Sequence, residues 1–116
     1  MEWDGRIKAS KARGKIEVEI FGDKSTNFTK ASLDDIVFST TAGSLDGAQF
    51  RKKKGKFKAD LEDINGDSFI DIEGTIKVKD LVKLGGVSPD SDSVFANFSQ
   101  DGATVMTFED QSVKIV

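Results

Sequence analysis

The chain has 116 residues, a length that fits one domain with a modest hydrophobic core. Hydrophobic residues make up 37% and charged residues 32% of it, which excludes wholesale disorder and membrane insertion. Cysteine, histidine and tyrosine are all absent, which argues against disulfides, zinc sites and the usual acid–base catalysts. We therefore expect one soluble domain, residues 1–116, that is not an enzyme.

The net charge is −3, but it is unevenly divided along the chain. Residues 1–58 carry 13 basic and 8 acidic side chains, whereas residues 59–116 carry 4 and 12. In a folded domain both halves interleave, so this division is typical of charged outer faces that keep a domain soluble. The alternative is head-to-tail association between copies of the chain.

The N-terminus reads Met1-Glu2-Trp3-Asp4 and lacks the basic and apolar regions of a signal peptide, so none is expected in this chain. No periodic pattern covers residues 1–8, which are expected to form a flexible or capping segment. Trp3 is expected to pack as a lid over one end of the domain rather than to contact a ligand.

The strongest periodicity after this segment is two, which predicts strands with one buried face. Ile16, Val18 and Ile20, for example, alternate with charged residues. The predicted strands lie, in chain order, at 16–20, 36–38, 57–61, 70–78, 94–98, 104–108 and 112–116. Helical turns are predicted at 32–35 and at 79–84, the latter ended by Gly85-Gly86. This pattern indicates an all-β fold, an antiparallel immunoglobulin-like β-sandwich of about seven strands with a short helical turn.

An acidic segment between two predicted strands carries the clearest chemistry. Its oxygen-bearing side chains stand at relative positions 1, 3, 5 and 9, and are Asp63, Asn65, Asp67 and Asp71. Ca²⁺ takes roughly six to eight oxygen ligands, and the backbone carbonyl of Phe69 at position 7 is expected to complete the set. The absence of histidine and cysteine argues against zinc and copper. The sequence therefore predicts a calcium site.

The segment is not an EF-hand, because Ser68 and Gly74 stand where that motif has Gly and a bidentate Glu. Asp60, Glu62 and Glu73 are further candidate ligands. The alternative is a plain turn rich in Asp, Asn and Gly. Calcium is favoured because crowded carboxylates repel one another unless a cation lies among them.

The order of these features resembles a family of calcium-binding β-sandwich accessory modules found in bacterial and archaeal extracellular proteins. The resemblance runs from Gly14–Gly22, through Phe28–Phe38 and the acidic loop Glu62–Asp71, to the closing segment 101–116. The family's loop usually has Gly and Pro where this chain has Ser68 and Ile70. The resemblance implies a non-catalytic unit in which calcium ties strands together, and an extracellular, cell-surface or virion location.

A basic run precedes the acidic segment, and consists of Arg51, Lys52, Lys53, Lys54, Lys56 and Lys58. It is typical of a solvated hairpin whose lysines protect an edge strand. The alternative is contact with a polyanion, such as a nucleic acid, an acidic glycan or an acidic patch on a neighbouring subunit. Phe57 is the one aromatic residue within the run, so sequence-specific binding of nucleic acid is not expected.

Together these observations predict a calcium-stabilised module with a structural or interaction role in a larger surface or virion assembly. Its partner is expected to be another protein or further copies of the chain. The alternative is an appended module that binds a polysaccharide or another polymer.

Overall fold

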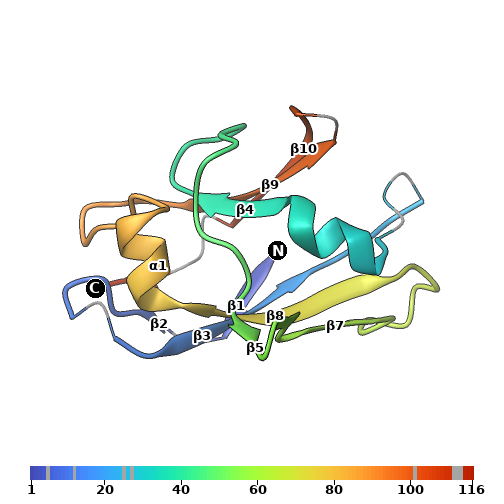
Figure 1. Cartoon of the computed structure of the whole chain (residues 1–116), viewed down its shortest axis with the longest axis horizontal. Helices are drawn as coiled ribbons and strands as arrows, with labels where there is room; N and C mark the ends of the chain where they lie inside the picture. Colours follow the sequence, from blue (N-terminus) through green and yellow to red (C-terminus); the bar gives the residue numbers. More distant parts are fainter. Residues whose placement is uncertain (5, 12, 25, 27, 101, 111–113) are drawn as a thin grey trace.

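Two antiparallel sheets build the protein, as seen in a computed structural model that describes residues 1–4, 6–11, 13–24, 26, 28–100, 102–110 and 114–116. The two sheets lie one above the other, and a helix covers one end of the space between them (Figure 1). The fold is all-β and sandwich-like, so the predicted fold class is confirmed.

The larger sheet has the strand order β1-β3-β8-β7, and its strands are β1 (Glu2–Asp4), β3 (Lys15–Ile20), β8 (Asp71–Lys77) and β7 (Ala59–Glu62). All neighbours in it are antiparallel. Val18 lies opposite Trp3 on one side and opposite Gly74 on the other. Gly74 is needed there, because a Cβ would lie 2.5 Å from the Phe50 ring.

The smaller sheet has the order β10-β9-β4, with β10 (Ala103–Asp110), β9 (Val94–Gln100) and β4 (Ile36–Ser39). The 3-10 helix η1 (Lys30–Asp35) leads directly into β4, and α1 (Val78–Lys83) follows β8. Both agree with the predicted helical turns. Among the described residues, no helix is long and apolar enough to span a membrane.

Two short strand pairs complete the fold. β2 (Arg6–Ile7) and β11 (Lys114–Ile115) pair in parallel, and β5 (Lys52–Lys53) and β6 (Lys56–Phe57) form a hairpin. The β2–β11 pair departs from the all-antiparallel prediction. It holds the end of the chain in place, since Val116 bonds through its backbone to both Ile7 and Ser10.

The core lies between the two sheets and draws on nearly every element. Val18, Ile20, Ile72 and Ile76 come from the larger sheet, and Ile36, Phe38, Val94 and Ala96 from the smaller one, all with no exposed surface. Phe38 lies at its centre, with ring centroids 5.1 Å from Phe50 and 5.9 Å from Trp3. The fully buried Leu81 of α1 closes one end.

The N-terminal segment was predicted to be flexible or capping, and the structure shows that it contains strands. Residues 2–4 form the edge strand β1, and Ile7 has no exposed surface. Trp3 packs against Phe38, as the prediction of a packed tryptophan requires. The segment lacks a clear alternating pattern because each strand is short, so its pairing is decided by the neighbouring strand rather than by its own sequence.

Two other predicted strands also have different limits. The strand predicted at 57–61 is interrupted at Lys58, so that β6 ends in the hairpin and β7 belongs to the larger sheet. Of the last predicted strand, residues 112 and 113 lie outside the described residues, and β11 covers Lys114–Ile115.

Replacing Val18 with Asp tests the strand assignment, because it places an uncompensated carboxylate between the two sheets. We expect a loss of at least ~3 kcal/mol in the free energy of unfolding, measured by urea denaturation. Lys15→Asp, on the exposed face of the same strand, is the matched control and is expected to cost less than about 1 kcal/mol. Equal losses in the two variants would contradict the assignment.

Candidate metal site

The acidic loop connects β7 to β8, and the Asp63 carboxylate organises its backbone. One oxygen, Oδ1, accepts hydrogen bonds from the N–H groups of Gly66 at 2.8 Å and Asp67 at 3.2 Å. The other, Oδ2, accepts one from the Ser68 N–H at 2.8 Å. A single side chain thus replaces the strand pairing that residues 63–70 lack.

Tight winding of the loop requires left-handed backbone at two positions, Gly66 with φ 76° and Ser68 with φ 73°. Glycine adopts this conformation without strain, whereas serine does so at a cost. The backbone at Ser68 therefore has the shape that a glycine favours. The hydrogen bond from Ser68 to Asp63 helps to offset the strain.

The side chains of the other predicted metal ligands lie close to Asp63. Asp67 accepts a hydrogen bond from the Phe69 N–H at 2.9 Å, and Asn65 accepts one from the Asp67 N–H at 3.4 Å. One carboxylate oxygen from each of Asp63, Asp67 and Asp71 lies within 4.8 Å of the other two. The structure therefore brings together the three predicted carboxylates, with the Asn65 side chain beside them.

Asp71 differs from the other two carboxylates because it has no exposed surface. Its Oδ1 accepts a hydrogen bond of 2.7 Å from the Gly22 N–H, and its Oδ2 accepts one of 2.9 Å from the Ile64 N–H. Bonds of this kind compensate a buried charge. Asp71 thus fastens the acidic loop to the turn that follows β3, and we refer to this arrangement as the Asp71 clasp.

The donor set suits a hard divalent cation. Asp63 and Asp67 are exposed, so an ion can enter from solvent, while Asp71 forms the inner wall. A carboxylate oxygen has two lone pairs, so Asp63 Oδ2, Asp67 Oδ1 and both Asp71 oxygens, which each accept one N–H bond, keep capacity for a metal. All donors are oxygens, which favours calcium or magnesium over zinc and copper. The role of the Phe69 carbonyl stays a prediction.

The further candidate ligands lie elsewhere. Asp60 and Glu62 are exposed on β7 and do not belong to the Asp63 group. Glu73 lies two residues beyond Asp71 along β8, on the outer face of the larger sheet, where it forms a second acidic group with Glu17 and Glu19. The prediction could not distinguish these positions, because strand register is not visible in the sequence.

An acidic row crosses the outer face of the larger sheet, and the sequence did not reveal it. The strand register places Glu2 opposite Glu19, Glu19 opposite Glu73, and Glu73 opposite Asp60. Like charges directly opposite each other destabilise a sheet. A hydrogen bond with Glu17, partial burial and repulsion from neighbouring glutamates raise the pKa of Glu73 to about 7.

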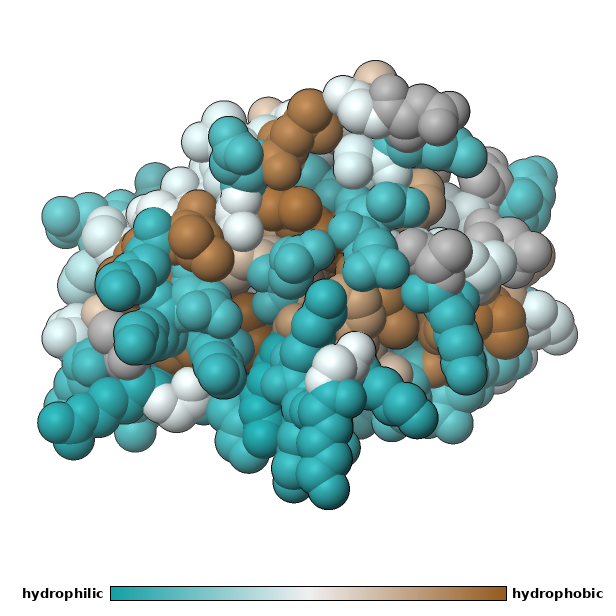
Figure 2. Space-filling view, in the orientation of Figure 1, coloured by the Kyte–Doolittle hydropathy of each residue, from teal (hydrophilic) through white to brown (hydrophobic). Residues whose placement is uncertain are grey.

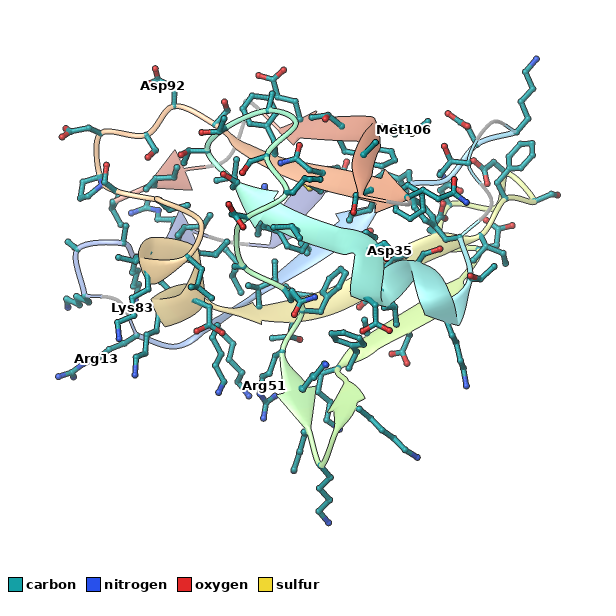
Figure 3. All side chains as sticks on the ribbon, turned by 45° about the horizontal axis from the view of Figure 1, so that its top comes forward. Arg13, Asp35, Arg51, Lys83, Asp92 and Met106 are labelled. Atoms are coloured by element: carbon teal, nitrogen blue, oxygen red, sulfur yellow. The ribbon has the colours of Figure 1, made fainter. Side chains whose placement is uncertain are left out.

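The predicted polyanion-binding residues lie in and beside the β5–β6 hairpin. Its turn has left-handed Lys54 and Gly55, with φ 55° and 78°, as a two-residue type I′ turn requires. The hairpin projects from the body, and its basic side chains form a hydrophilic protrusion (Figures 2 and 3). Five of the six basic residues are exposed, and Arg51, at the base, is half-buried. Polyanion contact remains a prediction.

Comparisons with models of protein families, with curated proteins and with solved structures found no significant match to this chain. The function is therefore argued from the geometry of the site.

Gly22→Ala tests the Asp71 clasp. A Cβ at this position would overlap the carbonyl oxygen of Ile70, so the turn must move and its N–H must leave Asp71. We expect a loss of about 1–3 kcal/mol in the free energy of unfolding, measured by urea denaturation. Lys24→Ala, exposed in the same turn, is the control and should change little. If Gly22→Ala left the free energy of unfolding unchanged, the Asp71 clasp would be refuted.

The acidic row predicts an unusual dependence of stability on pH. The folded-state pKa of Glu73, about 7, lies above its ordinary value of 4.5. Between these values the folded state binds a proton that the unfolded state has lost, so the contribution of Glu73 to stability falls as the pH rises from 4.5 to 7. Glu73→Gln should flatten this part of the profile, measured by thermal melting from pH 4.5 to 8. If Glu73→Gln kept the same fall in stability between pH 4.5 and 7, that fall could not be assigned to Glu73.

Proposed function

We propose that this protein is a non-catalytic module whose acidic loop binds one calcium ion, with a structural or interaction role in a larger assembly at a cell surface or in a virion. The observation that carries the proposal is the convergence of the Asp63, Asp67 and Asp71 carboxylates within 4.8 Å. Three negative charges so close together repel one another, and a divalent cation relieves that repulsion.

A structural role for the ion is supported by what its ligands hold. Asp63 organises the loop through three backbone N–H groups, and Asp71 joins this loop to Gly22 after β3. An ion among the carboxylates would therefore strengthen the link between β3, β7 and β8 at one end of the larger sheet. Calcium is favoured over magnesium because calcium accepts varied arrangements of roughly six to eight oxygens, whereas magnesium requires a near-ideal octahedron.

The absence of catalysis is proposed from the residue types and from the shape of the site. Histidine, cysteine and tyrosine are missing, and the loop is an exposed projection. Of three surface cavities in the described part of the chain, none is lined by Asp63, Asp67 or Asp71. A metal held at a projecting loop has no enclosed site in which to activate a substrate.

Polysaccharide binding is the weaker proposal. Sugar-binding surfaces usually present aromatic rings, but Trp3 is half-buried and packs against Phe38. Among the large hydrophobic residues that the structure describes as exposed, the one aromatic is Phe69, at 37%. A single ring at a loop tip does not form a platform.

Calcium binding is tested by thermal melting with calcium and with chelator. A ligand that binds the folded state stabilises it by RT ln(1 + [L]/Kd), about 2.7 kcal/mol at a hundredfold excess over Kd. We therefore expect a lower melting temperature in chelator. Asp67→Ala should remove most of this difference, because it removes one of the proposed ligands. Asp67 is the residue to change, because its carboxylate makes fewer hydrogen bonds within the fold than that of Asp63 or Asp71.

Asp90→Ala, which removes an exposed carboxylate far along the chain from the loop, is the matched control and should keep the full calcium response. A melting temperature indifferent to calcium and to chelator would overturn the proposal. Magnesium at the same concentration should give a smaller shift.

A further inference from the structure

A cavity at the opposite end of the larger sheet concentrates positive charge. Its volume is about 360 Å³, and its lining contains Arg6, Lys8, Lys11, Arg13 and Lys15. These residues come from β2, from the loop that follows it and from the first residue of β3, and Val78 at the start of α1 supplies an apolar wall. Two long-range contacts fix the ends of this loop, namely the pairing of β2 with β11 and the backbone hydrogen bond from the Val78 N–H to Gly14.

No acidic side chain lines this cavity, and this distinguishes it from the two others. The cavity beside the hairpin combines lysines with Asp34 and Asp60, and the third combines basic residues with Asp80. Within the described part of the chain, all five of these basic residues are exposed, so their charges are accessible to a ligand from solvent.

The arrangement also differs from the β5–β6 hairpin. The hairpin projects from the body (Figure 3), and Lys53 and Lys54 at its tip line none of the three cavities described. The five residues of the cavity instead surround one hollow, where a concave wall concentrates their field. Arg13 lies with Lys83 of α1 at the same end of the molecule, which adds to the positive potential there (Figure 3).

Both kinds of basic side chain in the cavity suit an oxyanion. An arginine guanidinium binds phosphate or sulfate through two parallel N–H···O bonds, and a lysine ammonium supplies a compact charge. The combined positive charge of these five groups is larger than a ligand with a single carboxylate can neutralise. The cavity has room for several oxyanion groups, but it is too small for a folded protein domain.

We propose that this cavity binds a multivalent oxyanion, with two or more phosphate or sulfate groups carried on one small molecule. The site is independent of the acidic loop, because β8 runs from Asp71 at the loop to Lys77 beside the cavity. Its seven residues span roughly 20 Å. The proposal can therefore be tested independently of calcium binding.

Isothermal titration calorimetry tests the proposal with two probes, inorganic triphosphate and a sulfated disaccharide. The buffer must be free of calcium, because triphosphate chelates that ion. We expect saturable binding of at least one probe that weakens as salt is raised from low to moderate concentration. Binding of triphosphate alone assigns the site to phosphate groups, and binding of the disaccharide alone assigns it to sulfate groups.

The double variant Arg6→Gln, Arg13→Gln should bind roughly tenfold more weakly, and Lys8→Gln, Lys11→Gln repeats the test with two other residues of the lining. The matched control is Lys53→Gln, Lys54→Gln, which removes the same charge from the hairpin and should keep near-normal affinity. Melting without ligand establishes that each variant folds. No binding of either probe, or equal weakening in the cavity and hairpin variants, would overturn the proposal.

Discussion

The buried carboxylate of Asp71 is the constraint on which the acidic end of the protein depends. It has no exposed surface, and both of its oxygens accept backbone N–H groups from segments far apart in the chain. Removing one such partner leaves a buried charge without compensation. The turn after β3 must therefore approach within contact of Ile70, which explains why position 22 is glycine. The clasp presets the loop, so that an incoming cation meets ligands already in place.

Charge is segregated along the β3–β8 pair. The acidic loop lies at one end, the cationic cavity at the other, and the acidic row crosses the face between them. Because the two ends are roughly 20 Å apart, changes at one should combine additively with changes at the other. The resulting dipole is compatible with the head-to-tail association that the sequence leaves open as an alternative, which stays a prediction.

The sequence predicted the elements whose burial has a clear period. Strand β3 alternates between buried and more exposed residues along its whole length, and β8 does so from Ile72 onward. The acidic loop was visible because its oxygen-bearing side chains have a regular spacing. The acidic row was not visible, since it requires the register of four strands. The cationic cavity was missed for a similar reason. Its basic residues are close in sequence, but only the pairing of β2 with β11 and of Gly14 with Val78 makes them surround one hollow.

The two ends of the sandwich are closed by different forces. At the α1 end, Leu81 and Val87 are buried against the core, so apolar contacts hold the chain. Beyond β7 and β8, residues 65–69 are all exposed, and the loop keeps its shape through hydrogen bonds to Asp63 and Asp71. The stability of apolar contacts does not depend on bound ions, whereas the stability of a loop organised by carboxylates does. The dependence on calcium that we propose should therefore be confined to one end, leaving the core and the cationic cavity unchanged.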